Sequence, residues 1–313
     1  MIELVSVTKR YGEQLAVDDV SLLIPEGELT VLLGPSGCGK TTTLRAINRM
    51  VEIDSGEVRL DGRSIAETPA HELRRSIGYA IQSVGLFPHM TVHRNIATVP
   101  RLLGWDAARV DARVNELLDI VGLDPETYAG KKPSELSGGE AQRIGVARAL
   151  AADPPVLLMD EPFGALDPIN RERLQREFAL LHKRLGKTVV FVTHDIGEAV
   201  LLGDRIVLMR DGRIVQSGVP ENLWRSPETA FVRDFFGDEF GLRILSRHRV
   251  SDLPVSSTVP LADAPRVRPD TNLRDVLAIM VTNTAEQVVV SDGDQVRGAL
   301  SFHDVVTGVR EAM

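Results

Sequence analysis

Residues 30–41 read TVLLGPSGCGKT, an apolar stretch followed by a glycine-rich loop and a lysine–threonine pair. The loop fits the pattern G-x-x-x-x-G-K-[ST], and it lies between an expected strand and an expected helix, the context that this pattern requires. Glycines let backbone N–H groups converge on phosphate oxygens, and the N-terminus of the following helix favours anions. The stretch therefore predicts a nucleotide phosphate site made by Gly34, Pro35, Ser36, Gly37, Cys38, Gly39, Lys40, Thr41 and Thr42.

Three side chains of this loop have predictable chemistry. Lys40 can reach the β- and γ-phosphates, and the Thr41 hydroxyl can bind Mg²⁺. Cys38 is the only cysteine of the chain, so an internal disulfide is excluded and a reducing cytoplasm fits best. A thiol near a helix N-terminus can be oxidation-sensitive, but a small filler residue is the interpretation that we prefer for Cys38.

The composition indicates a soluble globular chain with more than one domain. The 313 residues suit one large domain and a small one, with 43% hydrophobic and 26% charged residues. The net charge of -8 argues against a nucleic-acid partner. No signal peptide is visible, and no apolar run approaches the roughly 18 residues that a membrane span needs. If this chain serves a membrane, we therefore expect it to do so from outside the lipid.

Apolar strands and amphipathic helices alternate after residue 28, which predicts a mainly parallel sheet covered on both faces. Residues 2–33 read instead as short strands separated by turns. The expected strands of the parallel sheet are residues 30–33, 156–159, 189–192 and 205–209. The expected helices are residues 41–50, 107–122, 143–152 and 174–185. The fold class that follows is α/β with a nucleotide-binding sheet.

Two acids and a histidine follow two of these strands. Asp160 and Glu161 come directly after the strand 156–159, where a metal-linked carboxylate belongs if the strand ends beside the phosphate loop. Asp160 would hold Mg²⁺ through its water shell, and Glu161 would polarise an attacking water. A solvated turn is the alternative, and the nearby phosphate loop disfavours it. His194 follows the strand 189–193 to the same sheet edge and is expected to contact the γ-phosphate.

Residues 136–143 read LSGGEAQR and resemble the signature motif of ABC ATPases. The resemblance spans residues 1–236, with each expected motif in order. It implies an ABC-type P-loop NTPase: a mainly parallel core, an N-terminal antiparallel β subdomain and a helical subdomain over about 83–150. Ser137, Gly138 and Gly139 precede a helix and form a second backbone anion site. The family implies that this site binds the ATP of the other subunit, giving a head-to-tail homodimer that sandwiches two nucleotides.

The same resemblance assigns further residues. Tyr11 resembles the aromatic that stacks on adenine, although a tyrosine buried at the end of a strand is the alternative. Gln82 resembles the glutamine that senses Mg²⁺ and the channel subunit. Asp167, in the run Ala165-Leu166-Asp167, resembles the loop that links the two nucleotide sites across the dimer. Glu140 stands where the family often has glutamine, and we expect little effect from this difference.

Residues 85–92, GLFPHMTV, are similar to the segment by which importer ATPases grip the cytoplasmic loop of their channel. The alternatives are a buried segment or an aggregation-prone surface. An importer implies a transmembrane permease, an extracytoplasmic substrate-binding protein and a position at the cytoplasmic face of the inner membrane.

The C-terminal part resembles that of one importer subfamily. Residues 231–237 and 243–246 resemble ATPases of osmoprotectant importers, residues 238–260 have the composition of a linker, and residues 261–313 resemble a single α+β CBS repeat. In the run 298–304 the family's nucleotide pattern would place Ser301 at a phosphate and Asp304 at a ribose. Because CBS repeats usually pair, this one would pair with the copy in the other subunit. Ligand sensing and purely structural dimerisation both remain open.

The sequence therefore predicts the ATP-hydrolysing subunit of an ABC importer, using ATP and Mg²⁺, for glycine betaine, choline, carnitine or related quaternary amines. Three alternatives stand beside this prediction. An importer of another small solute, such as an amino acid, differs only in cargo. A soluble ABC protein of translation or DNA repair would usually carry two cassettes or a long insertion, and an exporter is disfavoured by residues 85–92 and by the CBS-like tail.

Overall fold

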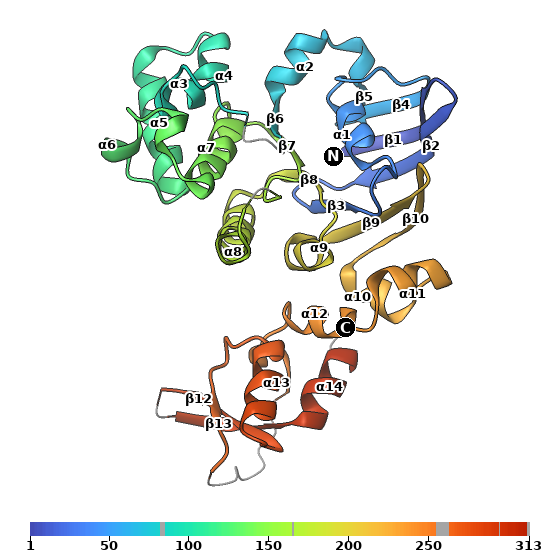
Figure 1. Ribbon diagram of the computed structural model, residues 1–313, viewed down its shortest axis with the longest axis vertical. Coiled ribbons are helices and arrows are strands. Elements are labelled where there is room, and N and C mark those ends of the chain that lie inside the picture. Colours follow the sequence, from blue (N-terminus) through green and yellow to red (C-terminus); the bar gives the residue numbers. More distant parts are fainter. Residues whose placement is uncertain (82–84, 165, 255–262, 294, 312–313) are drawn as a thin grey trace. The chain divides into compact units, whose positions relative to one another are not determined.

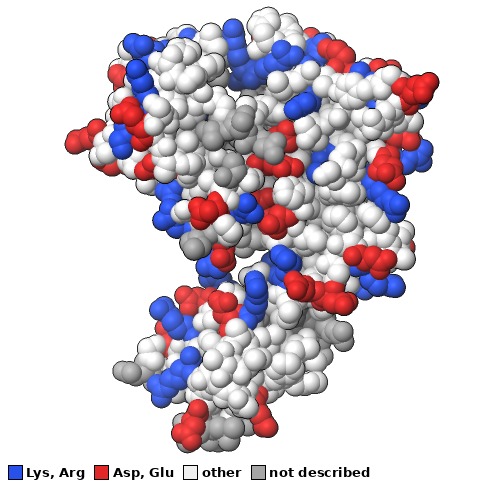
Figure 2. All heavy atoms as spheres, viewed as in Figure 1, with Lys and Arg blue, Asp and Glu red and all other residues white. Residues whose placement is uncertain are grey.

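The computed structural model describes residues 1–81, 85–164, 166–254, 263–293 and 295–311. The chain divides into two compact units, Met1–Val219 and Pro220–Met313 (Figure 1). Among the described residues, no helix combines the length and the apolar composition that a membrane span requires. Figure 2 shows basic and acidic side chains interspersed over the visible face of the first unit.

A six-stranded sheet forms the centre of the first unit, in the order β10-β9-β3-β8-β7-β6. Its strands are β3 (Leu29–Leu33), β6 (Ile77–Ala80), β7 (Val156–Asp160), β8 (Thr188–Val192), β9 (Arg205–Arg210) and β10 (Arg213–Gly218). Five strands run parallel, and β10 pairs antiparallel with β9. Every residue of β3, β7 and β8 is buried, because a parallel sheet is covered on both faces. The mainly parallel sheet expected from the sequence is confirmed.

A second, antiparallel sheet packs beside the first, in the order β2-β1-β4-β5. Its strands are β1 (Ile2–Tyr11), β2 (Gln14–Ile24), β4 (Ser55–Leu60) and β5 (Arg63–Ser64). Helix α1 (Lys40–Ile47) contacts β2 as well as β7 and β8, so it lies between the two sheets. Its Leu44 and Ile47 join a single apolar cluster with side chains from both sheets, including Leu4 and Val190. This packing fixes the helix that follows the phosphate loop.

The helical part of the first unit lies at the β6 and β7 side of the sheet (Figure 1). It contains α3 (Val92–Ile96), α4 (Thr98–Leu102), α5 (Ala107–Ile120), α6 (Pro125–Tyr128), the 3₁₀ turn η2 (Pro133–Glu135) and α7 (Gly138–Leu150). The remaining elements are η1 (Ile65–Glu67), α2 (Ala70–Ser76), α8 (Pro168–Leu185) and α9 (Ile196–Leu202). Helix α7 begins five residues before the predicted start at Arg143, because Ser137 caps it and Gly138 and Gly139 are helical.

The second unit is a small α+β structure. Its helices are α10 (Pro220–Arg225), α11 (Ala230–Phe236), α12 (Phe240–Leu245), α13 (Leu273–Thr282) and α14 (Phe302–Glu311), with the 3₁₀ turn η3 (Val250–Asp252). Its sheet has the order β11-β12-β13, made by β11 (Arg266–Val267), β12 (Gln287–Asp292) and β13 (Gln295–Ser301). The helix, two strands and helix expected over 271–310 are all present.

The division between the units differs from the expected boundary at residue 237 and linker over 238–260. Helices α10 and α11 group with the second unit. Phe240 stacks on Phe236 with ring centroids 4.0 Å apart, and Ile244 and Val250 are fully buried. The glycine- and proline-containing composition suggested a linker, but these apolar side chains find partners on α10 and α13, which are distant in sequence. Residues 255–260 of the expected linker lie outside the described residues.

We predict that Glu221 makes the stability of the second unit depend on pH. Its carboxylate accepts a hydrogen bond from Arg247 Nε at 2.8 Å and lies 3.4 Å from His248 Nε2. Burial raises the carboxyl pKa, but the nearby His248 ring and the Arg247 guanidinium outweigh burial and lower the pKa from 4.5 to about 2. The folded pKa lies below the unfolded one, so the stabilisation is complete above pH 4.5 and disappears as the pH falls towards 2.

The measurement compares urea unfolding of the parent chain and Glu221→Gln by fluorescence of Trp224 on α10, in a Trp105→Phe background that removes the other tryptophan. The parent should be more stable at pH 6, by up to about 3 kcal/mol for a pKa shift of this size, and the difference should shrink at pH 3. A stability difference that does not change with pH would contradict this role of Glu221.

Candidate active site

The phosphate loop connects β3 to α1 in a conformation that two of its positions can adopt only as glycine. Gly34 has φ 147° and Gly39 has φ 107°. A Cβ atom would lie 2.2 Å from the Met209 carbonyl oxygen at Gly34, and 2.3 Å from the Ala16 carbonyl oxygen at Gly39. The loop is therefore pressed against β9 and β2 at its ends, whereas residues 35–37 between them are exposed. A ligand can reach this exposed backbone.

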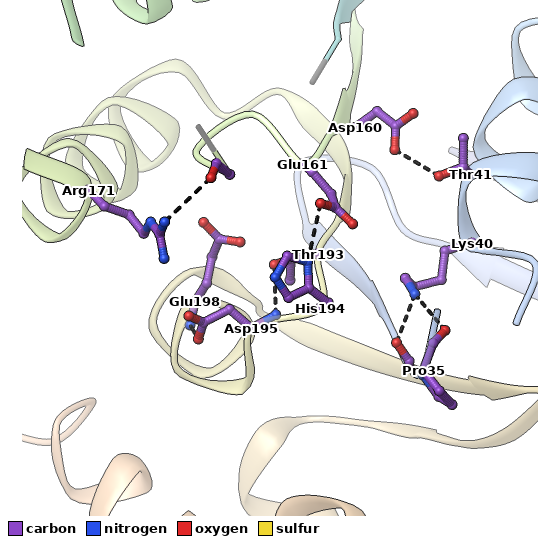
Figure 3. A network of polar contacts seen from close by, with 12 residues as sticks. Pro35, Lys40, Thr41, Asp160, Glu161, Arg171, Thr193, His194, Asp195 and Glu198 are labelled. Atoms are coloured by element: carbon purple, nitrogen blue, oxygen red, sulfur yellow. Dashed lines mark hydrogen bonds and ion pairs between the residues drawn. The ribbon is translucent and has the colours of Figure 1, made fainter. Parts of the chain in front are cut away.

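The start of α1 has the electrostatic character of an anion site. No side chain caps the helix N-terminus at Gly39, and the first turn contains no acidic residue. The Lys40 ammonium is buried and donates to the carbonyl oxygens of Gly34 at 2.8 Å and Pro35 at 3.0 Å (Figure 3). The helix N-terminus without a side-chain cap, the helix dipole and one ammonium group thus favour a phosphate at the loop.

Two oxygen donors suited to Mg²⁺ lie beside the loop. The Thr41 hydroxyl donates to Asp160 Oδ1 at 3.0 Å, and burial is the main cause that raises the pKa of Asp160 (Figure 3). Among the described residues, no group of three or more His, Cys, Asp or Glu could hold a metal alone. Mg²⁺ commonly binds through one or two protein oxygens, substrate phosphates and water. Asp160 and Thr41 fit that arrangement, in which the metal would neutralise charge on the phosphates.

Glu161 and His194 face each other at the same sheet edge. His194 Nδ1 lies 3.2 Å from Glu161 Oε2 (Figure 3). The Glu161 backbone has φ 45°, in the left-handed region, and its N–H donates to the Val192 carbonyl oxygen at 2.9 Å. Strained backbone of this kind persists where the surrounding structure holds it, often at functional sites. The strain turns the Glu161 side chain towards β8 and the loop that carries His194.

The signature-like residues lie elsewhere in the unit, at the start of α7 in the helical part (Figure 1). Ser137 is the N-cap, and its N–H donates to the Glu140 carboxylate at 2.7 Å. Glu140 also accepts a hydrogen bond from the Tyr128 hydroxyl, which ties α7 to α6. The sequence interpretation missed this structural role of Glu140, although the S-x-x-E spacing of a capping box was readable at 137–140.

Comparison with known proteins agrees with this geometry. The family model described as ABC transporter matches residues 17–164. The glycine betaine uptake system ATP-binding protein YehX of Escherichia coli is 49% identical over 98% of this chain and 99% of its own length. The chain belongs to the ATP-binding proteins of ABC transporters. The predicted family, ABC fold class and ATPase activity are thereby confirmed.

Other proteins similar to this ABC ATPase include a longer relative and a shorter solved cassette. The osmoprotectant import ATP-binding protein OsmV of Salmonella typhimurium is 50% identical and is covered over 77% of its length. The solved dimeric structure of a bacterial ABC transporter cassette is 38% identical, with a TM-score of 0.63, and aligns with 70% of this chain and 98% of its own. A post-hydrolysis state of that cassette, bound to ADP and phosphate, aligns with a TM-score of 0.62.

Four of the sequence interpretations concern single residues of the ABC ATPase site, Tyr11, Cys38, Gln82 and Asp167. The Tyr11 side chain at the end of β1 is 50% exposed, so the alternative of a buried core tyrosine does not apply. Cys38 is buried, and burial is the main cause that raises its thiol pKa, which favours the filler interpretation over a reactive thiol. Gln82 and Ala165 lie outside the described residues. Asp167 caps α8 by accepting the Asn170 N–H at 3.1 Å.

The segment 85–91 of this ABC ATPase forms an exposed loop held by one buried side chain. Asn95 is fully buried; its amide accepts the Phe87 N–H at 2.7 Å and donates to the Phe87 and Thr91 carbonyl oxygens. The Phe87 ring is 40% exposed, so the alternative of a buried segment does not hold for it. The loop borders a groove of about 370 Å³ whose lining includes Tyr79, Gly85, Phe87, Thr98, Arg148 and Pro154.

We predict that the Thr41 hydroxyl is required for Mg²⁺-dependent hydrolysis. Thr41→Val keeps the shape of the side chain and removes the oxygen beside Asp160, whereas Thr41→Ser keeps the oxygen. The valine variant should lose at least about tenfold in ATPase rate at moderate Mg²⁺, as is typical when a metal-site partner is removed. A Mg²⁺ titration of ATPase activity tests this. Equal Mg²⁺ dependence in the valine, serine and parent chains would show that Thr41 takes no part in the metal site.

Proposed function

We propose that this chain is the ATP-hydrolysing subunit of an importer of osmoprotectants of the quaternary-amine class. The observation that carries the proposal is the extent of the matches. The relatives named for glycine betaine uptake, osmoprotectant import and choline transport match 98%, 94% and 95% of this chain. Relatives named for Fe(3+) ions and spermidine/putrescine import match 85% and 76% at 45% identity, and one named for glycine betaine/carnitine/choline transport also matches 76% but at 53% identity. The matches that reach through the C-terminal residues, together with this higher identity, therefore favour quaternary amines over another small solute.

In the proposed hydrolysis, each part of the sheet edge has one task. The phosphate-loop N–H groups and Lys40 hold the β- and γ-phosphates. Thr41 and Asp160, with Gln82, would hold Mg²⁺, which neutralises the charge that develops on the phosphates. Glu161 accepts a proton from the attacking water. His194 orients the Glu161 carboxylate through their 3.2 Å contact and meets the γ-phosphate.

The second proposed element is a head-to-tail homodimer in which Ser137, Gly138 and Gly139 bind the nucleotide of the other copy. Supporting this, a Cβ atom at Gly138 or Gly139 would meet only ordinary contacts in its own chain, at 3.8 Å from Leu166 and 3.6 Å from Leu174. Neither glycine is therefore needed for the packing of one chain, whereas a phosphate approaching the backbone would require them. The half-exposed Tyr11 ring is proposed to stack on adenine, and Asp167 to lie at the dimer contact.

The third proposed element is the membrane complex. The exposed Phe87 ring and the neighbouring groove form a suitable seat for a cytoplasmic loop of a permease. The chain would then act at the cytoplasmic face of the inner membrane, with a substrate-binding protein on the other side. The relatives described above are named for uptake, import or transport, so their names do not support a soluble ABC function or an exporter.

For the CBS-like tail, we favour structural pairing with the second copy over nucleotide binding. The Asp304 carboxylate accepts both the Ser301 N–H at 2.8 Å and the Ser301 hydroxyl at 2.7 Å, at the start of α14. A nucleotide would have to replace these bonds. Phe302 on the same helix is 52% exposed, which leaves an apolar side chain for a partner.

We predict that Glu161→Gln keeps ATP binding and removes turnover, because the amide has the same shape but cannot accept the proton. The ATPase rate should fall about 10²–10⁴-fold, the usual contribution of a general base. The variant should also accumulate as an ATP-bound dimer in size-exclusion chromatography. A parent-like rate would refute the assignment of the base.

The cargo is tested in cells of the source organism that lack the gene. Uptake of labelled glycine betaine and choline should be lost, restored by the parent gene and not restored by Glu161→Gln. Spermidine uptake serves as the matched control and should be unaffected. Loss of spermidine uptake with intact uptake of glycine betaine and choline would overturn the substrate class but not the ATPase assignment.

We predict that Ser36 of one copy and Ser137 of the other approach each other only with ATP bound. In a Cys38→Ala, Glu161→Gln background, one chain carries Ser36→Cys and the second Ser137→Cys. A short bis-maleimide should then crosslink unlike chains when ATP is present. A pair placed at two exposed sites away from the proposed interface, such as Asp61→Cys with Glu67→Cys, is the control. Equal crosslinking with and without ATP would contradict the sandwich arrangement.

A further inference from the structure

A buried carboxyl lies behind the proposed site and takes no part in the hydrolysis described above. Glu198, in the first turn of α9, is 5% exposed. It accepts a hydrogen bond from the side-chain amide of Gln175 on α8 at 3.0 Å, and Gln175 is itself buried. A buried carboxylate is costly unless hydrogen bonds or charges compensate it. The groups that donate hydrogen bonds to the Glu198 carboxylate therefore indicate which segment of the chain it holds in place.

Glu198 is bonded to both neighbours of His194 in the chain. The Thr193 hydroxyl donates to the Glu198 carboxylate and accepts the Asp195 N–H at 3.0 Å. The Glu198 N–H in turn donates to Asp195 Oδ1 at 3.1 Å. Figure 3 shows Thr193, Asp195 and Glu198 gathered beside His194, on the side away from Lys40. The loop that carries His194 is thus anchored on either side of that residue.

The same helix α8 also holds the loop that leads from Glu161 to Asp167. Arg171, one turn before Gln175, donates to the carbonyl oxygen of Leu166 at 2.8 Å and to that of Gly164 at 3.4 Å. The Arg171 charge also stabilises the Glu198 carboxylate. Through Arg171 and Gln175, α8 therefore connects the loop after β7 with the loop after β8 (Figure 3).

We propose that Glu198 is a positioning residue for ATP hydrolysis, whose carboxylate locks the His194 loop to α8 so that His194 stays aligned with Glu161. This inference rests on the proposed roles of Glu161 and His194. The carboxylate accepts hydrogen bonds from Gln175 and Thr193 together, whereas a neutral amide or acid in its place keeps one acceptor oxygen and turns the other position into a donor. The loop would then lose one of its anchors, and turnover would fall more than ATP binding.

Protonation of the Glu198 carboxylate would make turnover depend on pH, an effect that a purely structural residue would not produce. Burial raises the pKa of Glu198 to about 7, against the hydrogen bonds from Thr193 and Gln175. Asp195 raises this pKa and Arg171 lowers it, while strand β3, which packs against α9, carries no ionisable side chain. As the pH falls through 7, the carboxylate gains a proton and loses acceptor capacity. The kcat should therefore rise between pH 6 and pH 8.

The test compares the pH profile of ATP hydrolysis by the full-length parent and Glu198→Gln. The glutamine mimics the protonated acid, so kcat at pH 8 should fall about 10- to 100-fold, the loss expected for one hydrogen bond to a charged group. The kcat of the variant should change little between pH 6 and pH 8, and its KM for ATP should stay within about twofold of the parent's, since binding and turnover are separable effects. Glu172→Gln is the matched control, because Glu172 lies exposed on the same α8.

A second variant keeps the test valid if Glu198→Gln fails to fold. Thr193→Val removes the hydroxyl donor and keeps the shape; it should reproduce the loss of kcat at pH 8, with no further loss in the double variant. A parent-like pH profile in Glu198→Gln, or a parent-like kcat in Thr193→Val, would overturn the inference. Those results would leave the proposed function standing if Glu161→Gln still abolishes turnover.

Discussion

The site depends on one constraint: neighbouring parallel strands end at the same edge of a sheet. Val192 of β8 pairs with Leu32 of β3 on one side and with Asp160 of β7 on the other. This register brings the phosphate loop, the acids that follow β7 and the histidine that follows β8 to one edge, although residues 34–41 and 160–194 are far apart in sequence. A shift of the register would move the metal-linked carboxylate away from Thr41.

The electrostatics of the edge follow from how its groups are buried. The one ammonium in the loop, Lys40, is held by carbonyl oxygens of the loop itself, so it is oriented before a nucleotide arrives. Asp160 is buried beside Thr41, whereas His194 is largely exposed and contacts Glu161 from the solvent side. Lys40, Thr41 and Asp160, which would hold the nucleotide and its metal, are thus oriented by hydrogen bonds within the chain, and His194, which would meet water, is accessible. Such preorganised polar groups are how phosphoryl-transfer sites lower their barrier.

A single chain carries two separate halves of the proposed machinery. The phosphate loop belongs to the sheet, whereas Ser137–Gly139 begin a helix of the helical part and are held there by Glu140 and Tyr128. Two buried polar side chains, Asn95 and Glu198, hold loops that are proposed to contact partners or the nucleotide. Asn95 shapes the exposed loop at Phe87, and Glu198 anchors the loop of His194. Buried, fully bonded groups of this kind give loops a defined conformation without a large apolar core.

The sequence by itself determined the class of fold, the phosphate loop, the acids after β7 and the family, because these depend on local patterns with a fixed spacing. It also placed the strands and helices of the tail, whose apolar periodicity is strong. It did not reveal the packing of residues 238–253, because the burial of Phe240 and Ile244 involves the contacts of α12 with α10 and α13, which local composition does not show. Only the tertiary structure decided that Tyr11 is exposed, that Cys38 is a buried filler and that Glu198 anchors the loop of His194. Burial and pairing across the chain are properties of the packed structure, and a one-dimensional pattern contains neither.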